Sequence, residues 1–365
     1  MSKSFRDLEL LIENCDDEIV LDSDIVLGDG EGPIYLEGIN LDSDVIIDGN
    51  GHSIDACGKV RIFYSSGELT IKNISLLNGY SDESGGAIVV DGGKMDIIDS
   101  IISGNYSADD GGAIHIEEGE LALINSTVKE NKAKEFGGAI NNWDSLKILN
   151  CEISSNEGRF GGAILNNDGN LEISDSLFKD NKADKGGVIY NQDGDFSVEK
   201  TLFEKNKASA DGGVFYNENC DISVIESKLN DNQADKGGVI YNNGVFIIKD
   251  CELINNRAND GGSIVNYEAE LNVMGSSLSG NLSNHGGAIY TYDGEMSIDE
   301  SRFDDNRAEC GGAIYSEKCI WDVSNSEFNS NRAKRSGGAI LLKKSKYETN
   351  EIIFKDNSPD DVSNF

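Results

Sequence analysis

The residue types that most often do chemistry are thinly scattered through this sequence of 365 residues. The three histidines, His52, His115 and His285, lie far apart, and none of the seven cysteines forms the CxxC pair that favours a zinc site. Glycoside hydrolysis needs two carboxylates held about 5–10 Å apart in a groove. Acidic pairs such as Asp109 and Asp110 are interpreted mostly as a solvated acidic face. We predict no catalytic residues, no metal site and no cofactor, and leave weak Ca²⁺ binding by the acidic surface open.

Asparagine recurs at steps of 24 to 26 residues along most of the chain. The positions are Asn131, Asn156, Asn181, Asn206, Asn232, Asn256, Asn281, Asn306 and Asn331. A large apolar residue stands three residues before each one, as Phe303 does before Asn306. An amide carries two donors and an acceptor, so stacked amides can bond each other and the turn backbone. We predict a structural ladder here rather than a catalytic role.

Tyrosine recurs in a second column, at Tyr190, Tyr216, Tyr241, Tyr290 and Tyr315. Each follows an apolar residue such as Ile189. Consecutive side chains of a strand point to opposite faces, so these tyrosines point outward if Ile189 and its equivalents point inward. An exposed aromatic row could stack on sugar rings or receive a partner protein. The structural alternative is a ladder that only covers the sheet. We take the five tyrosines as candidate binding residues.

Both columns belong to one internal repeat. A Gly-Gly-small-apolar tetrad begins at Gly85, Gly111, Gly137, Gly161, Gly186, Gly212, Gly237, Gly261, Gly286, Gly311 and Gly337, in steps of 24 to 26 residues. Between tetrads lie short alternations of apolar and polar residues, such as Leu171, Ile173 and Phe178, which indicate strands with one buried face. Such a repeat has room for three strands and no helix. We predict an all-β, single-domain parallel β-helix of about 12–13 coils.

The paired glycines and two cysteines have structural interpretations in this solenoid. The glycines allow a turn with positive φ or a close contact between coils, and no Lys-Ser/Thr follows them as in a phosphate-binding loop. Cys151 and Cys251 stand in a column of serine and threonine, two residues before the large apolar position. We predict that both are buried thiols. They lie four coils apart, about 19 Å at the stacking distance, too far for a disulfide.

The open ends of a solenoid need covers. Ser4 and Asp7 have the spacing of a capping box at the start of a helix. The apolar stripe of that helix would comprise Phe5, Leu8, Ile12 and Cys15. We predict a capping helix over residues 1–16, irregular first coils over 17–68, β-helix repeats over 69–357, and a polar tail over 358–365 that frays.

Composition limits the partners. The formal net charge is −35, which repels phosphate, so we expect no nucleic-acid partner. No run approaches ~18 consecutive apolar residues, so we expect no membrane insertion. The 42 glycines beside only 2 prolines fit tight turns whose neighbouring N–H groups are in use. The N-terminus lacks the basic-then-apolar run of a secretory signal, which predicts a cytoplasmic protein if the chain is full length.

Two motifs resemble those of known β-helix families. Gly311-Gly312-Ala313-Ile314, preceded by Phe303-Asp304-Asp305-Asn306, resembles the GGAI and FxxN repeats of chlamydial polymorphic outer-membrane proteins. The N-terminal part, including the run from Ile46 to Ala56, resembles adhesin-like β-helix proteins of methanogenic archaea. The resemblance implies a right-handed parallel β-helix and, as in most such relatives, a role in adhesion at the cell surface.

These observations favour a non-catalytic solenoid that presents an extended binding surface to a protein or carbohydrate ligand, adhesin-like in type. The first alternative is a polysaccharide lyase or glycoside hydrolase with a pectate-lyase-like fold. Two observations argue against this alternative. The coil length is nearly constant, so there are no long insertions to build the walls of an active site. The only prolines are Pro33 and Pro359, and neither lies in an Arg-x-Pro-x-x-Arg motif of the type expected in a pectate lyase. The second alternative is a cytoplasmic scaffold.

Overall fold

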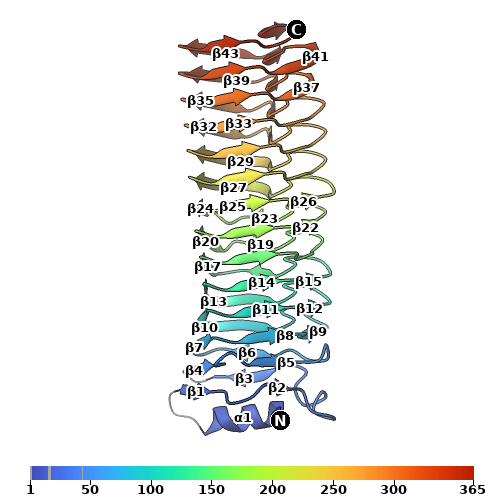
Figure 1. The fold of residues 1–365 in the computed structure, drawn as a ribbon, viewed down its shortest axis with the longest axis vertical. Helices are drawn as coiled ribbons and strands as arrows, with labels where there is room; N and C mark the ends of the chain where they lie inside the picture. The colour runs from blue at the N-terminus through green and yellow to red at the C-terminus, as the bar shows by residue number, and fades with distance from the viewer. Residues whose placement is uncertain (1, 15–17, 43) are drawn as a thin grey trace. The chain divides into compact units, whose positions relative to one another are not determined.

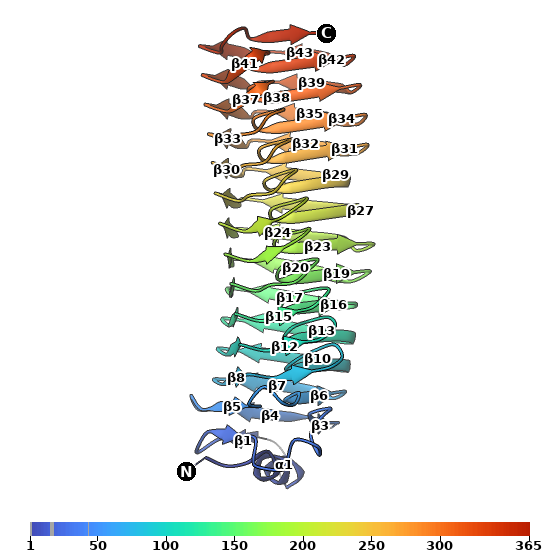
Figure 2. The same ribbon diagram turned by 90° about the vertical axis from the view of Figure 1, so that its right-hand side faces the viewer.

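The structure is a computed structural model that describes residues 2–14, 18–42 and 44–365. Apart from one short helix in this described part, the regular elements are β-strands, and neighbouring turns pair in parallel (Figures 1 and 2). The predicted parallel β-helix is therefore confirmed. The chain divides into two compact units, Met1–Lys182 and Ala183–Phe365, called unit 1 and unit 2 below. Strand β22 (Lys182–Ala183) falls at the division.

Unit 1 has strands on three sides. Its main sheet comprises β1 (Glu18–Val20), β3 (Ile39–Leu41), β4 (Val45–Asp48), β6 (Phe63–Ser65), β7 (Glu68–Lys72), β10 (Ile88–Ile98), β13 (Ile114–Ile124), β16 (Ile140–Asn142), β17 (Ser145–Leu149), β19 (Ile164–Asn167) and β20 (Asn170–Ser174). The second sheet comprises β2 (Ile25–Val26), β5 (Ser53–Asp55), β8 (Ser75–Leu77), β11 (Ile101–Ser103), β14 (Thr127–Lys129), β18 (Glu152–Ser154) and β21 (Leu177–Lys179). The third side carries β9 (Tyr80–Ser81), β12 (Tyr106–Ser107) and β15 (Lys132–Ala133).

Unit 2 repeats this plan. Its main sheet comprises β23 (Ile189–Gln192), β24 (Phe196–Glu199), β27 (Phe215–Ile225), β29 (Ile240–Lys249), β31 (Ile264–Tyr267), β32 (Glu270–Met274), β34 (Ile289–Tyr292), β35 (Glu295–Asp299), β38 (Ile314–Glu317), β39 (Ile320–Ser324), β42 (Ile340–Lys343), β43 (Lys346–Asn350) and β45 (Val362–Asn364). The second sheet comprises β25 (Leu202–Glu204), β28 (Lys228–Asn230), β30 (Glu252–Ile254), β33 (Ser277–Ser279), β36 (Arg302–Asp304), β40 (Glu327–Asn329) and β44 (Ile353–Lys355). The third side carries β26 (Lys207–Ala208), β37 (Arg307–Cys310) and β41 (Arg332–Ser336), and isolated bridges join its other turns.

The core is a stack of large apolar side chains on the second sheet. In unit 2 the register aligns Phe203, Leu229, Leu253, Leu278, Phe303 and Phe328, all with 0% exposure. The rings of Phe303 and Phe328 stack with centroids 4.7 Å apart. Because neighbouring turns lie about 4.8 Å apart, each turn buries its apolar face against the next one. The columns predicted from the repeat are therefore columns in space.

The two glycines of each tetrad have different structural roles. Gly111 has φ +59°, a left-handed conformation that side chains disfavour. Gly112 faces the next turn so closely that an added Cβ would lie 2.2 Å from the carbonyl oxygen of Gly138. Both predicted reasons for the pair, a positive φ and a close contact between coils, are present.

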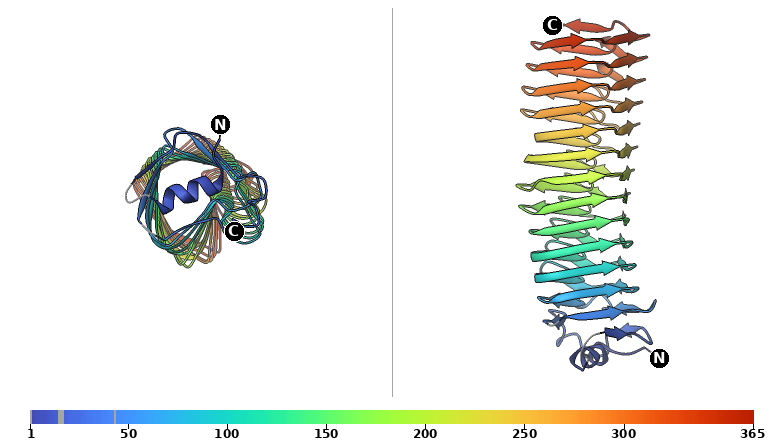
Figure 3. Two further views of the ribbon diagram at one scale, coloured as in Figure 1. Left: turned by 90° about the horizontal axis from the view of Figure 1, so that it is seen from below. Right: turned by 90° about the vertical axis from the view of Figure 1, so that its left-hand side faces the viewer.

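The ends of the chain are covered by different means. Helix α1 (Phe5–Glu13) lies across the end of the first turns of unit 1, as the left panel of Figure 3 shows, and buries Phe5 and Leu8. Ser4 and Asp7 form the capping box. Cys15 of the predicted stripe lies outside the described residues. At the C-terminus the expected fraying is not found, since β45 pairs with β42 and so extends the main sheet.

Candidate binding surfaces

The tyrosine column of unit 2 forms stacks of aromatic rings. Tyr190 and Tyr216 stack with centroids 4.9 Å apart and an interplanar angle of 7°, and Tyr216 stacks on Tyr241 at 5.4 Å and 8°. The next turn has Val265 in this register, and the column resumes with Tyr290 and Tyr315, whose centroids are 5.3 Å apart.

These tyrosines are partly covered. Tyr190, Tyr216, Tyr241 and Tyr290 are half-buried, and Tyr315 is buried. Burial raises the pKa of Tyr241 to about 12 and raises the pKa of Tyr190 and Tyr290 as well. Because Tyr216 has a ring on each face, it offers a ligand its edge and hydroxyl rather than a free face. Tyr190 already donates its hydroxyl to Glu218 at 3.0 Å, so Tyr216 and Tyr241 are left to donate to a ligand. Face-to-face stacking on a sugar is open only at the ends of a stack.

A row of charged or titratable residues borders the tyrosines, one position before the glycine pairs from Gly186 to Gly286. Lys185 Nζ lies 4.3 Å from the ring centroid of Tyr216 and donates to its hydroxyl over 3.1 Å. Lys185 also lies 3.9 Å from a carboxylate oxygen of Asp211. Further along, His285 Nδ1 and Asp260 Oδ1 are 2.7 Å apart. The surface around the row is thus polar and internally paired.

The asparagine column is a continuous buried ladder within each unit. Its members are 0–1% exposed. Asn256 is typical, because its Oδ1 accepts from the backbone N–H of Asn232 at 2.9 Å and its Nδ2 donates to the carbonyl of Leu229 at 2.8 Å. The same amide also donates to Asn281 Oδ1 at 3.2 Å. These groups are inaccessible to a substrate and fully used by the turns.

A second amide ladder, on the main sheet, was not predicted from the sequence. In unit 2 it comprises Asn191, Asn217, Asn242 and Asn266, each 0% exposed, joined by Nδ2–Oδ1 distances of 2.8–3.1 Å. In unit 1 Asn142 and Asn166 are joined at 2.7 Å. The pattern is visible in the sequence, because each of these asparagines stands two residues after the apolar residue of a Gly-Gly-small-apolar tetrad.

The thiols in the serine column accept backbone hydrogen bonds as serine does. Cys151 Sγ accepts from the backbone N–H of Ser126 at 3.4 Å, and Cys251 Sγ from that of Ser227 at 3.3 Å. Both cysteines are free and buried, as predicted. Burial raises the pKa of Cys251 to about 11, so this thiol stays protonated and unreactive near neutral pH.

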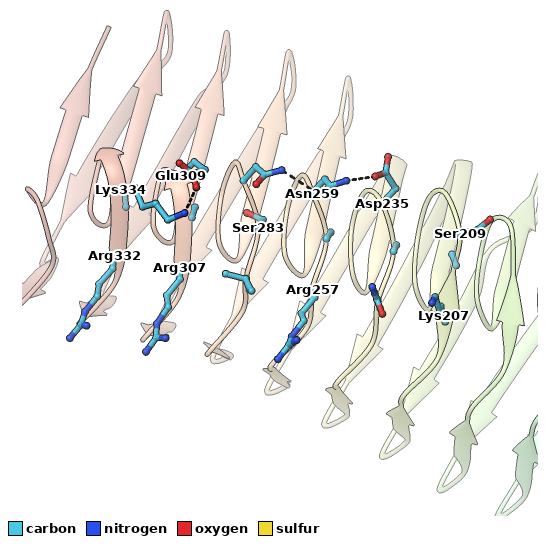
Figure 4. Close-up of a pocket in the computed structure, with 18 of the residues that line it drawn as sticks. Lys207, Ser209, Asp235, Arg257, Asn259, Ser283, Arg307, Glu309, Arg332 and Lys334 are labelled. Carbon is cyan, nitrogen blue, oxygen red and sulfur yellow. Dashed lines mark hydrogen bonds and ion pairs between the residues drawn. The ribbon is translucent and has the colours of Figure 1, made fainter.

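A groove on the third side of unit 2 was not predicted. Its volume is about 880 Å³, and it runs from Lys207 to Ser358 across seven successive turns. Each turn contributes three consecutive residues to the groove, directly after the ladder asparagine. The first lines one wall, the second lines the floor and the third lines the other wall, as Arg257, Ala258 and Asn259 do. Figure 4 shows Arg257, Arg307 and Arg332 extended along one side, with Asp235 and Glu309 on the opposite side.

Unit 1 holds the most strongly shifted acid and histidine near the main sheet. Burial raises the pKa of Asp110 to about 6, although the backbone N–H of Phe136 donates to its Oδ1 at 3.0 Å. Burial, followed by the charge of Arg61, lowers the pKa of His115 to about 4. The buried Nδ1 of His115 has no hydrogen-bond partner among the described residues.

Two further observations concern metal binding and membrane spans. Within residues 2–14, 18–42 and 44–365, no group of three or more histidine, cysteine, aspartate or glutamate side chains is arranged to hold a metal ion. No helix in the described part of the chain is both long and apolar enough to cross a membrane.

The chain is similar to known β-helix proteins. The profile described as a right handed beta helix region matches residues 58–229, and the Chlamydia polymorphic membrane protein repeat matches residues 300–317 and 325–343. No curated protein sequence matches the chain.

Two solved structures are similar at low identity. The A-module of a mannuronan C-5 epimerase from Azotobacter vinelandii has a TM-score of 0.35 and 10% identity, covering 88% of this chain and 90% of that one. Tailspike protein 3 of bacteriophage CBA120 has a TM-score of 0.37 and 11% identity, over 100% of this chain and 61% of that one, so the chain spans about three fifths of the tailspike's length. The fold is a right-handed parallel β-helix, and its last turns are similar to chlamydial polymorphic membrane protein repeats.

Proposed function

We propose that this protein is a non-catalytic β-helix that binds a carbohydrate or protein ligand along its sides, in the manner of an adhesin. The groove of unit 2 carries this proposal, because it is long, open and continuous over seven turns. An extended groove suits an extended ligand, in the same way that the repeated surfaces of other solenoids do.

A binding survey with the full chain tests the proposal. Immobilised acidic glycans, neutral glycans and surface proteins are probed in parallel, and the soluble fraction is assayed for new reducing ends and for unsaturated sugars. We expect retention on at least one ligand class with no change in the ligand. Absence of binding to every class, or the release of degradation products, would contradict a non-catalytic binding role.

The tyrosine row is proposed as a contributor through its hydroxyls. The triple variant Tyr190→Phe, Tyr216→Phe and Tyr241→Phe keeps the stacked rings and removes only the three hydroxyl groups. We expect weaker retention of the folded variant on the ligand that the survey identifies. Retention equal to that of the parent protein would limit the row to covering the sheet.

A polysaccharide lyase or hydrolase remains the second candidate, and Asp110 is the observation that favours it. A carboxyl whose pKa is raised to about 6 is the type of group that serves as a general acid. If the survey detects degradation, Asp110→Asn should abolish it while leaving binding intact. Degradation that survives this substitution would exclude Asp110 from the chemistry.

A further inference from the structure

We propose that the groove of unit 2 binds a linear carboxylated polysaccharide, whose carboxylates are held by Lys207, Arg257, Arg307 and Arg332. The inference rests on the proposed binding function and names the ligand class and the residues that recognise it. It is independent of the tyrosine row, which is a separate surface of the same unit.

The cations form a straight row along the groove. They occupy the same position in their turns, joined by parallel bridges through Gln233 and Leu282 and by the pairing of β37 with β41. At about 4.8 Å per turn, Lys207, Arg257, Arg307 and Arg332 follow one another at about 10, 10 and 5 Å. An extended chain of pyranose rings advances per sugar by about the spacing of one turn. The carboxylates of neighbouring or alternate sugars can therefore lie opposite successive cations.

The four cations lack partners of their own. All four side chains are exposed, and within the described residues no hydrogen bond or ion pair engages them. They lie unpaired in one row, although the chain has 66 acidic residues against 31 basic ones. A guanidinium presents a planar fork that matches a carboxylate bidentately, and these three arginines have that fork free.

The acids across the groove do not neutralise the row. On the opposite wall Asp235 accepts from Asn259, and Glu309 pairs with Lys334. Figure 4 shows these contacts running along their own wall, away from the arginines. That wall therefore offers carboxylate and amide oxygens that can accept hydrogen bonds from hydroxyl groups, while the arginine wall offers positive charge.

The floor between the walls is made of small side chains. Ala208, Ala234 and Ala308 are 2–8% exposed at the base of the groove. Methyl groups suit the C–H faces of sugar rings. The groove thus has three kinds of contact, a cationic wall, an apolar floor and a hydroxyl-binding wall, and an acidic sugar chain has the group that matches each one.

The equivalent row in unit 1 is different. There Lys132 lies 2.6 Å from Glu157, its neighbour in the next turn, so the positive charge is neutralised within the protein. Glu157 thus stands between Lys132 and Lys182 in this row of unit 1, whereas the row of unit 2 contains no acidic residue. The free charge is a property of the side chains chosen in unit 2, and the β-helix itself does not require it.

A carboxylated polysaccharide fits better than a nucleic acid. The net charge of −35 repels any polyanion, so it does not distinguish the two ligands. Single-stranded nucleic acid, however, is held largely by bases stacked on aromatic side chains. No aromatic side chain lines the groove. A polysaccharide with one carboxylate on every sugar needs no aromatic platform and has abundant hydroxyl groups for the opposite wall.

The test is affinity electrophoresis and calorimetry of the full chain with alginate and polygalacturonate, and with dextran, polyphosphate and single-stranded DNA for comparison. The variant is Arg257→Gln, Arg307→Gln and Arg332→Gln. The control is Lys249→Gln, Lys346→Gln and Lys355→Gln, which removes three exposed cations from other surfaces of unit 2. Circular dichroism and melting temperature establish that each protein is folded.

We expect the parent and control proteins to bind a carboxylated polymer and the arginine variant to bind about tenfold or more weakly. Binding should fall as salt is added. Ala258→Glu, which places a carboxylate on the half-buried floor, should weaken binding in the same direction.

Three results would overturn the inference: equal binding by the arginine variant, binding to polyphosphate or DNA alone, or binding to dextran as strong as to alginate. If the survey finds a ligand that the arginine variant still binds, only this inference fails. If no ligand of any class binds the parent protein, the proposed function fails with it.

Discussion

At the scale of single residues, each turn of the helix has corners where the chain must take a left-handed conformation. Asn125, Asn150, Glu300 and Asn325 all have φ between 49° and 52° at the corner before the serine column. Asparagine tolerates this region because its short side chain bonds locally, whereas other side chains are strained there by roughly 1–2 kcal/mol. Glu300 is therefore at a position that suits asparagine better.

We predict that Glu300→Asn raises the free energy of unfolding by about 1 kcal/mol. The equivalent corners of the neighbouring turns hold Gly275 and Asn325, both with positive φ. Urea denaturation measures the change. Glu295→Asn is the control, since Glu295 is exposed on β35 without a positive φ, and it should give no stabilisation.

His115 makes stability depend on pH. Its pKa is lowered to about 4 in the folded protein, whereas an unfolded histidine titrates near pH 6.5. Between these values the unfolded state binds a proton that the folded state does not, so stability falls as the pH falls. Above about pH 6.5 the histidine is neutral in both states and costs no stability. At pH 5 the uptake of a proton by the unfolded state lowers the free energy of unfolding by about 2 kcal/mol.

We predict that His115→Asn removes this part of the pH dependence. The substitution follows the ladder, because Asn141 occupies the paired position in the next turn. Unfolding free energies of both proteins are measured from pH 7.5 to about pH 5, the range in which the histidine titrates. The variant should lose about 2 kcal/mol less than the parent; parallel profiles would contradict the assignment.

At the scale of elements, the amide ladder holds neighbouring turns together. We predict that Asn256→Ala lowers the free energy of unfolding by about 3 kcal/mol, because it leaves the buried N–H of Asn232 and the carbonyl of Leu229 without their partners. Asn259→Ala is a matched control three residues away, where the amide is exposed and bonds Asp235.

The control should change stability by less than about 0.5 kcal/mol. Thermal and urea unfolding of both variants compare the two amides directly. Equal effects of the buried and the exposed substitution would show that the ladder is not what holds these turns.

At the scale of the whole molecule, the excess of acidic residues sets the response to salt. A net charge of −35 destabilises the folded state by self-repulsion. Raising the salt from about 0.01 M to about 0.1 M shortens the screening length from about 30 Å to about 10 Å. We predict that the melting temperature rises over this range at neutral pH.

The same titration near pH 4, where many carboxylates are protonated, should show a smaller rise. A melting temperature that falls with salt at neutral pH would mean that exposed ion pairs, such as Lys228 with Glu252, outweigh the repulsion. Differential scanning calorimetry distinguishes the two signs.

The repeat alone dictates which residues share a column. In parallel strands without register shifts, equivalent residues of successive turns lie next to each other, as Phe303 and Phe328 or Asn256 and Asn281 do. Residues that recur at the period of the repeat therefore form a column along the solenoid. The β-helix, the buried thiols of Cys151 and Cys251 and the two roles of each glycine pair could therefore be predicted. The C-terminal tail could not, since its pairing with β42 depends on an edge that no local pattern describes.

The geometry of the contacts within each column was decided by the tertiary structure. The sequence shows that Tyr190 and Tyr216 are equivalent, but only the ring planes show that neighbours cover each other's faces. Likewise, Arg257, Arg307 and Arg332 share a period with Lys132, yet Lys132 has a glutamate within reach and the arginines have none. The orientation of side chains within a column controls the ring contacts, and it depends on how the turns pack against each other. The glutamate beside Lys132, by contrast, stands one repeat further along the sequence.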